Sequence, residues 1–508
     1  MIAYANGGAV WVPTTTFDVL ERATREQPDA TALVCDGRRL SYRGYQHCVE
    51  VLAGRLMARS PGSRIVIGLR NGMAICVAVL GCQRAGLLPT TLNPDYSARE
   101  LQPMMEDADP DLVIAHAELV DRFAGRRFLG VHDDGAFIAE LLAAPPPAAL
   151  RAVDPDADAV LQFTGGTTGR PKGVVLTHRA VAINVAQREA RLPTDFGDER
   201  IVCAMPLYHV FAVAMGLHMA AYAAGTLIIL AKYRPDSLLD AIAVERATRL
   251  PAGPTLFHSL LTYEGLTRDR LATLRCCYSG SAPLSVATLD RWEKATGITI
   301  FEGYGQSEAG PVLTYSGPDA PAAPGTVGRA LPLTDIRVVD PATGVLLPPG
   351  TSGEIVARGP QIMRNYLANP GATAEALRDG WLHTGDIGRM DASGVLTIED
   401  RKKDMAIVGG FNVYPREVDE LLMAHPGVSE AAALGVPDGY RGETIWAFVV
   451  AREDLSEADV DAWCAEHLVR YKRPTTVRLV DALPRTPAGK IDKSALRRRA
   501  AEEQSLVA

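Results

Sequence analysis

The segment Leu161–Thr177, LQFTGGTTGRPKGVVLT, constrains the fold of this chain most strongly, because a loop rich in glycine and threonine lies between two apolar runs. The β-branched Val174 and Val175 favour a strand after the loop, and the apolar run before it favours another. Glycine lets backbone N–H groups approach a ligand closely, while threonine hydroxyls and Lys172 suit phosphate oxygens. The loop is not a Walker A motif, because Lys172 follows Gly169 by three residues and precedes a strand. We therefore predict a β-hairpin that binds the phosphates of a polyphosphate.

Segments on both sides of this hairpin alternate between short apolar strands and helices. An example is the strand predicted at 64–69, which is followed by a helix predicted at 74–85. This alternation is typical of parallel sheets with helices on both faces. Ligands of such sheets bind at the carboxyl ends of the strands. We therefore expect the loops 164–173, 279–284 and 302–311 to meet at one site.

The pattern changes after residue 320, where segments such as DIRVVD and GVLTIED alternate apolar and polar residues between turns. This period of two predicts a small antiparallel β subdomain. The charged cluster DRKKD, at 400–404, then precedes a compact α+β pattern. A chain of 508 residues is too long for a single core. We expect an α/β protein: residues 1–400 would form a large N-terminal domain of two helix-covered sheets plus the β subdomain, and residues 401–508 a mobile α+β lid.

Composition and charge are typical of a cytoplasmic globular protein. The formal net charge of −8 argues against nucleic acid as a partner. The eight cysteines form no C-x-x-C pair, so we expect buried, reduced thiols. No signal peptide is evident at the N-terminus. Residues 210–231 are nearly uncharged and long enough to span a bilayer, but they contain His218 and end in a β-like run. We predict a buried helix that runs into a central strand, and no integral membrane segment.

Five motifs occur in the order that is found in the adenylate-forming superfamily, which this chain resembles from about residue 15 to residue 498. They are the phosphate loop, YGQSE (304–308), WLHTGDIG (381–388), DRKKD with GGFNVYPREVD (400–419) and PRTPAGK (484–490). The superfamily includes acyl- and aryl-CoA synthetases, firefly luciferase and the adenylation domains of nonribosomal peptide synthesis. LQFTGGTTG, PLYHVFA and DRKKDMAIVGGFNVYP are most similar to the long-chain fatty acyl-CoA synthetases.

The resemblance implies an AMP-forming acid–thiol ligase. A carboxylate attacks the α-phosphate of ATP to give acyl-AMP and pyrophosphate, and the thiol of coenzyme A then displaces AMP. The implied cofactors are ATP, Mg²⁺ and coenzyme A, and the expected substrate is a medium- or long-chain fatty acid. Aryl or short branched acids stay open, as does an acyl-AMP ligase that loads an acyl carrier protein, and so does the choice between monomer and homodimer. The joint presence of Lys490, Glu308 and Asp386 argues against a non-catalytic relative.

The resemblance assigns roles in the chemistry to five residues. Lys490, on a turn after a glycine, would bridge the carboxylate and the α-phosphate, where negative charge builds up. His209 alone is typical of a core histidine, but the resemblance places it at the carboxylate and the acyl pocket. Lys403 matches the hinge about which the small domain rotates between the two steps. Glu308 is the implied Mg²⁺ ligand, with Thr167.

Further residues are expected to bind the nucleotide and coenzyme A. Tyr304 would stack on adenine, Asp386 would accept both ribose hydroxyls, and Arg401 would add contacts from the hinge side. Gly409 and Gly410 would let the pantetheine arm lie against the backbone. The full set expected to bind these cofactors is Thr164, Gly165, Gly166, Thr167, Thr168, Gly169, Lys172, Ser281, Ala282, Glu302, Gly303, Tyr304, Gly305, Gln306, Ser307, Asp386, Arg401, Gly409 and Gly410.

Two departures from the family pattern concern the acyl pocket. Ser281 replaces a glycine in SGSAPL and would narrow that pocket. Val213 lies in a region where some long-chain enzymes carry a gating tryptophan. Both substitutions leave the expected chemistry intact and the length of the acyl chain open.

Overall fold

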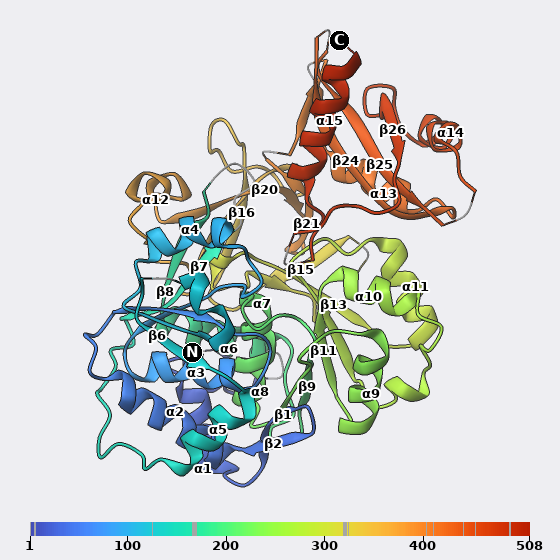
Figure 1. Cartoon of the computed structure of the whole chain (residues 1–508). Coiled ribbons are helices and arrows are strands. Elements are labelled where there is room, and N and C mark those ends of the chain that lie inside the picture. Colours follow the sequence, from blue (N-terminus) through green and yellow to red (C-terminus); the bar gives the residue numbers. More distant parts are fainter. Residues whose placement is uncertain are drawn as a thin grey trace.

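A computed structural model of the chain describes residues 2–4, 7–123, 125–164, 170–317, 323, 325–402, 404–409, 411–439, 441–452, 454–486 and 489–507. Figure 1 shows a large body, which contains most of the chain, and a smaller unit above it, which contains the C-terminal residues. Helices cover mostly parallel sheets in the body, so the predicted α/β class is confirmed.

The largest sheet contains 14 of the described strands, and about half of it is parallel. In this half the order is β2-β1-β10-β9-β11-β12-β13, and only β2 runs antiparallel to its neighbour. The bounds are β1 Thr31–Cys35, β2 Arg38–Ser41, β9 Arg200–Cys203, β10 Thr226–Ile229, β11 Arg249–Ala252, β12 Cys276–Ser279 and β13 Ile300–Tyr304. The carboxyl ends of β12 and β13 therefore lie side by side.

The same sheet continues beyond β13 as antiparallel strands in the order β14-β15-β21-β20-β17-β16, with β19 paired to β20. The bounds are β14 Thr314–Tyr315, β15 Thr326–Ala330, β16 Asp335–Val339, β17 Gly353–Arg358, β19 Leu377–Arg378, β20 Trp381–Met390 and β21 Val395–Arg401. The expected antiparallel strands are present. They are hydrogen-bonded to the parallel half, because β14 pairs with β13.

Two smaller sheets complete the body. One is parallel, in the order β4-β3-β5-β6, with bounds β3 Arg64–Gly68, β4 Leu88–Thr91, β5 Leu112–His116 and β6 Phe128–Val131. The other has the order β18-β8-β7, with bounds β7 Asp158–Thr164, β8 Lys172–Thr177 and β18 Asn365–Tyr366.

The α-helices of the body are α1 Asp18–Glu26, α2 Tyr42–Leu56, α3 Met73–Arg84, α4 Ala98–Ala108, α5 Asp134–Ala143, α6 His178–Arg191, α7 Val210–Ala212, α8 Met219–Tyr222, α9 Pro235–Glu245, α10 Pro254–Leu261, α11 Val286–Thr296 and α12 Pro370–Ala376. Short 3₁₀ turns are η1 Ala117–Phe123, η3 Asp269–Leu271 and η4 Ser307–Ala309, and η2 Val213–His218 is a π-helix.

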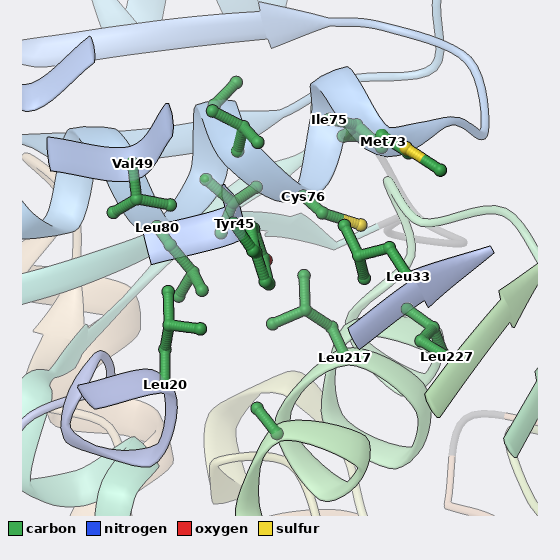
Figure 2. Close-up of a cluster of buried hydrophobic side chains, with 14 of the residues drawn as sticks. Leu20, Leu33, Tyr45, Val49, Met73, Ile75, Cys76, Leu80, Leu217 and Leu227 are labelled. Atoms are coloured by element: carbon green, nitrogen blue, oxygen red, sulfur yellow. The ribbon is translucent and has the colours of Figure 1, made fainter. Parts of the chain in front are cut away.

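Helix α3 is buried along nearly its whole length, which explains why its sequence is apolar on all sides. Figure 2 shows how it joins the two parallel sheets: Cys76 and Leu80 of α3 lie near Tyr45 of α2 and Leu33 of β1. Ile65 of β3 belongs to the same buried cluster. One continuous core therefore fixes α3 between the sheets.

The C-terminal unit is built on the sheet β23-β22-β25-β24, with β26 beside β25. Its elements are β22 Ala406–Val408, β23 Phe411–Val413, α13 Pro415–Met423, β24 Val428–Asp438, β25 Gly442–Ala451, α14 Glu457–His467, β26 Thr476–Leu479 and α15 Lys493–Val507. Alternate residues of β24 face two cores: Ala433 packs with α13 and α14, and Leu434 packs with α15. Helices thus cover both faces of this small sheet.

The apolar segment that could have spanned a membrane is part of the body. Residues 210–222 form α7, η2 and α8, and β10 follows within the large sheet. None of the helices that the structure describes is long and apolar enough to cross a bilayer. All eight cysteines are buried and free, as expected.

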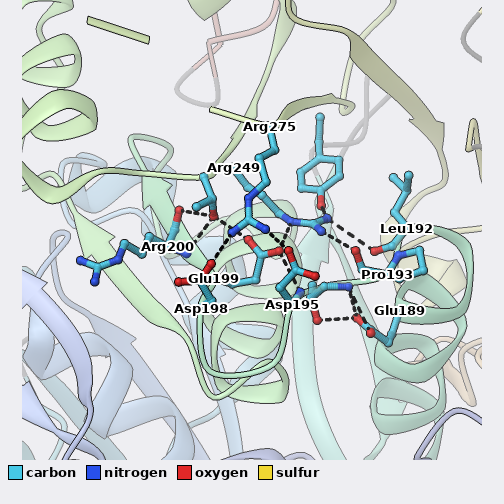
Figure 3. Close-up of polar contacts among 12 residues, drawn as sticks. Glu189, Leu192, Pro193, Asp195, Asp198, Glu199, Arg200, Arg249 and Arg275 are labelled. Carbon is cyan, nitrogen blue, oxygen red and sulfur yellow. Dashed lines mark hydrogen bonds and ion pairs between the residues drawn. The ribbon is translucent and has the colours of Figure 1, made fainter. Parts of the chain in front are cut away.

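A buried ion pair lies at the amino ends of the parallel strands β9 and β11. Arg249 Nε lies 2.8 Å from Glu199 Oε1, and both side chains are buried (Figure 3). Thr248 Oγ1 donates to the other oxygen of Glu199. Ligands of such sheets bind at the opposite, carboxyl ends of the strands. We therefore assign this ion pair to the stability of the fold and not to ligand binding.

Candidate active site

Both strands of the predicted hairpin are present. Strands β7 and β8 pair antiparallel, and Thr164 lies opposite Lys172 at the open end of the pair. The residues between them, Gly165, Gly166, Thr167, Thr168 and Gly169, lie outside the described residues. Lys172 itself is exposed and its Nζ lies 5.1 Å from the ring centroid of Tyr366.

Tyr366 connects this hairpin to Glu308. It lies in β18, which pairs with β8, and its hydroxyl donates a hydrogen bond of 2.7 Å to Glu308 Oε1. Burial and the Glu308 carboxylate raise the pKa of Tyr366, so it stays a hydroxyl donor. The described base of the hairpin, at Lys172 in β8, and the loop 302–311 are therefore linked through Tyr366.

The residues at this point fit a magnesium ion. Glu308 is largely buried and presents an isolated carboxylate in the 3₁₀ turn η4. Among the described residues there is no group of three or more His, Cys, Asp or Glu side chains that could hold a metal by themselves. One carboxylate beside the hairpin that is predicted to bind phosphate suits Mg²⁺, which commonly takes one or two carboxylates together with phosphate oxygens.

Tyr304, Asp386 and Arg401 come together from three strands. Tyr304 ends β13, and its hydroxyl donates to Asp386 Oδ2 at 2.6 Å. Asp386 and Arg401 lie opposite each other in β20 and β21, with Arg401 Nε 3.4 Å from Asp386 Oδ1. Burial raises the pKa of Tyr304 well above its usual value, so it remains a donor. A tyrosine ring, a carboxylate and a guanidinium thus form one wall of the site.

The loop after β12 lies beside the loop after β13. Ser279 pairs with Glu302, and the backbone N–H of Leu284 donates to the Glu302 carboxylate. Burial raises the pKa of Glu302 to about 8, which Arg416 and this hydrogen bond oppose. Gly305 has no room for a side chain, because a Cβ there would collide with the carbonyl of Pro311. The loops 279–284 and 302–311 therefore meet.

The remaining predicted positions in these two loops are also described. Ser281, with φ +70°, and Ala282 lie in the loop after β12. Gly303 belongs to β13, where the Tyr315 ring leaves no room for a Cβ. Gln306 precedes η4 and Ser307 opens it.

Lys490 reaches the same site from the far end of the chain. It lies on a turn that Arg485 and Ile491 close by pairing, and Thr486 N donates to Lys490 O at 2.7 Å. Burial and Arg401 lower the pKa of Lys490 to about 8, whereas Asp386 raises it. The ammonium is therefore close enough to both side chains for their charges to act on it.

The Lys490 turn rests on the beginning of helix α10. Thr255 Oγ1 donates to the carbonyl of Gly489 at 3.3 Å, and Arg485 Nη1 donates to Thr255 Oγ1 at 3.1 Å. These contacts are exposed. They link the C-terminal unit to the body at the point where the lysine enters.

His209 lies at the beginning of α7. Its Nδ1 accepts a hydrogen bond of 3.2 Å from the backbone of Phe211. Burial, and the charge of Lys490, lower the pKa of His209 to about 4, so the imidazole is neutral at pH 7. Because Nδ1 accepts, the proton is on Nε2, which can donate to a carboxylate.

A cavity of about 40 Å³ lies behind the beginning of this helix, between α3, α6, β4, β7, β8 and η2. Much of its lining is apolar, and Val213 is part of it. Other apolar residues of the lining are Val79, Val160, Val181, Val210 and Ala214. This cavity is the candidate acyl pocket.

One predicted residue of the described chain, Gly409, is not brought to this site. Gly409 lies between β22 and β23, with φ +58°, and its N–H donates to Arg441 O within the C-terminal unit. Lys403 and Gly410 lie outside the described residues. The roles of these three residues stay predictions.

Sequence reasoning missed Tyr366, Thr255 and Arg485. Tyr366 is one of 15 tyrosines, and no local pattern marks it as the partner of Glu308. Arg485 stands within PRTPAGK and could have been noticed there, as could Thr255, which follows Gly253-Pro254 at the start of helix α10. Their pairing depends on how the two units meet.

Comparisons with known proteins agree with this arrangement. Residues 20–367 match the family described as AMP-binding enzyme, and residues 417–490 match the AMP-binding enzyme C-terminal domain. A long-chain-fatty-acid–CoA ligase of Bacillus subtilis (strain 168) is 33% identical, and the match covers 97% of this chain and 95% of that protein. A 3-[(3aS,4S,7aS)-7a-methyl-1,5-dioxo-octahydro-1H-inden-4-yl]propanoyl:CoA ligase of Mycobacterium tuberculosis (strain ATCC 25618 / H37Rv) is 37% identical, over 94% of this chain and 97% of that one.

A solved structure is similar as well. ATP-bound MatB from Rhodopseudomonas palustris superposes with a TM-score of 0.90 at 32% identity, and the match covers 96% of this chain and 99% of that one. The chain belongs to the family of AMP-binding enzymes. The predicted class, an AMP-forming acyl-CoA ligase that uses ATP and coenzyme A, is confirmed at this level.

Proposed function

We propose that this chain activates a carboxylic acid as its adenylate and transfers the acyl group to coenzyme A. The observation that carries this proposal is the position of Lys490, whose charge acts on Asp386 and Arg401 of the nucleotide wall and on His209 beside the acyl cavity. A cation at this junction can neutralise two anions that must approach each other, a carboxylate and an α-phosphate.

In the adenylation step, each group of the site has one task. The hairpin with Lys172 and Thr167 holds the β- and γ-phosphates, and Tyr304, Asp386 and Arg401 hold the nucleoside. Glu308 would hold a Mg²⁺ ion, which supplies charge neutralisation between phosphates when bound. His209 donates from Nε2 to the substrate carboxylate. Lys490 stabilises the charge that grows on the α-phosphate as pyrophosphate leaves.

The thioester step requires a different arrangement. Coenzyme A must reach the carbonyl carbon that Lys490 faces, so the lysine must withdraw. We propose that residues 401–508 act as a lid on the body formed by residues 1–400, with Lys403 at the hinge and Gly409 and Gly410 beside the pantetheine arm. The contacts between the Lys490 turn and Thr255 support this, because they are few and exposed.

The proposed substrate is a medium- or long-chain fatty acid, in line with the name of the Bacillus subtilis relative. A second candidate, a compact aryl or branched acid, is favoured by the small volume of the cavity, about 40 Å³. A long chain would need this cavity to open further. An acyl carrier protein in place of coenzyme A is the third candidate. We propose a cytoplasmic monomer or homodimer.

The test is a screen of ATP–pyrophosphate exchange and AMP release over acids of graded length and aromaticity. Exchange is expected with the acid alone, and rapid AMP release only when coenzyme A is added. If coenzyme A has no effect and AMP is released only when an acyl carrier protein is added, the acceptor is the carrier protein and not coenzyme A. Absence of exchange with every acid would refute the proposed function.

A further inference from the structure

Two buried polar side chains line the acyl cavity and have atoms without a hydrogen-bond partner. They are Gln83, from helix α3, and His218, from the end of η2. Gln83 is 0% exposed and His218 is 2% exposed. Buried polar atoms are rarely left unpaired, because each costs about 1–3 kcal/mol. Such atoms around a substrate cavity therefore point to a ligand.

The orientation of Gln83 follows from its one hydrogen bond. Its Nε2 donates to the carbonyl of Ala159 at 3.1 Å, and a carbonyl can only accept. The side-chain oxygen, Oε1, is therefore the atom left without a partner among the described residues. Gln83 thus offers a hydrogen-bond acceptor from helix α3, whose other buried residues are all apolar.

Neither ring nitrogen of His218 has a partner within the described part of the chain. Burial and the nearby Arg188 guanidinium lower the pKa of His218 to about 3, so the ring is neutral at pH 7. A neutral imidazole carries one donor and one acceptor. His218 therefore offers one of each.

The position of His218 relative to His209 indicates which part of a substrate it meets. Both belong to one helical run, because α7 and η2 follow His209 without a break. Nine residues along a helix correspond to roughly 10–14 Å, the π-helical turns being shorter. With the carboxylate at His209, His218 faces a distant part of the acyl group.

From these side chains, and on the basis of the proposed function, we infer that the preferred acid carries a hydroxyl group at the inner end of its acyl chain or ring. A hydroxyl can donate to Gln83 Oε1 and can accept from the N–H of His218, so it can pair with one atom of each side chain. A ketone could only accept and would leave Gln83 Oε1 unpaired. A methyl group would leave both unpaired, at a cost of about ten- to a hundredfold in kcat/KM.

A buried water molecule is the competing occupant, since 40 Å³ holds at least one. Matched pairs of acids distinguish a substrate hydroxyl from a water molecule as the occupant of the cavity. Octanoate is compared with ω-hydroxyoctanoate, and phenylpropanoate with its para-hydroxyphenyl analogue, by kcat/KM in coenzyme A thioester formation. The hydroxylated member of at least one pair is expected to be favoured about ten- to a hundredfold. Equal or better activity of the plain member of both pairs overturns the inference, while the proposed function stands. No activity with any acid refutes both.

Variants test whether the named side chains cause the preference. His218→Phe removes both nitrogens and is expected to bring the ratio of the two kcat/KM values close to one, chiefly by lowering kcat/KM for the hydroxylated acid. Leu217→Met, in the neighbouring core position, is the matched control and should keep the wild-type ratio. If His218→Phe does not fold, judged by thermal melting, Gln83→Met provides the same test. A preference that survives loss of either side chain overturns the assignment.

Discussion

The nucleotide wall and the Lys490 turn are held in very different ways. In the wall, Tyr304 donates to Asp386 at 2.6 Å, and close by Tyr366 donates to Glu308 at 2.7 Å, with both carboxylates largely buried. The Lys490 turn touches Thr255 through exposed hydrogen bonds of 3.1 and 3.3 Å.

This difference suits the two halves of the proposed reaction. The buried hydrogen bonds to the two carboxylates contribute about 1.5–3 kcal/mol each. Water competes with the exposed hydrogen bonds of Thr255, which therefore contribute less. In the proposed reaction, the wall would therefore stay in place while the lysine leaves after the first step. The same nucleotide can then be held through both steps, with one face of the lid replaced by another.

The largest expected effect comes from removing the lysine. Lys490→Ala should lower ATP–pyrophosphate exchange at least about 10³-fold, because the positive charge proposed to bridge the two anions is lost. Thioester formation from supplied acyl-AMP should be almost unchanged, because the wall is intact. Both rates are measured on the same preparation. Equal loss of both would mean that Lys490 belongs to the fixed half of the site.

Removal of the Glu308 charge is expected to act on the fixed half. Glu308→Gln keeps the size of the side chain and an oxygen for Tyr366, but it should lower adenylation about 10²-fold and raise the Mg²⁺ concentration needed for half-maximal rate. Tyr366→Phe is the control, because it retains the charge and loses only the hydrogen bond. Its effect should be about tenfold or less. An unchanged Mg²⁺ dependence in Glu308→Gln would contradict the metal assignment.

The pH dependence of the adenylation rate tests the role of the Lys490 charge separately from that of the nucleotide wall. Only the protonated form of Lys490 carries the needed charge, and its pKa of about 8 lies below the usual value. Adenylation should therefore fall as the pH rises through about 8, by about tenfold per unit above it. In Lys490→Arg the guanidinium stays charged, so this basic limb should disappear even though the rate is lower. A limb that persists in this variant would belong to another group.

The sequence predicts the nucleotide wall better than the contacts of the Lys490 turn. The hairpin, Glu308 and the row Tyr304, Asp386 and Arg401 are continuous with strands whose patterns are readable, and family motifs mark each of them. The ion pair of Arg249 and Glu199 and the contact of Thr255 with Gly489 join residues 50 and 234 positions apart. No local period specifies such pairs, since they depend on how separate elements pack. The unpaired atoms of Gln83 and His218 in the acyl cavity could not be predicted from the sequence for the same reason.

The smallest expected effect concerns the contact that holds the lysine in position. Thr255→Ala removes the hydroxyl that joins Gly489 and Arg485, an exposed contact worth about 0.5–1 kcal/mol. Adenylation should fall only about two- to fivefold, and thioester formation from supplied acyl-AMP should be unchanged or slightly faster, because the lid is released more easily. Thr262→Ala, at the end of the same helix and away from the turn, is the matched control. Single-turnover measurements of each step give the two rates. If Thr255→Ala slowed both steps equally, the lysine turn would have to be part of a rigid assembly, and the contrast between the two regions would fail.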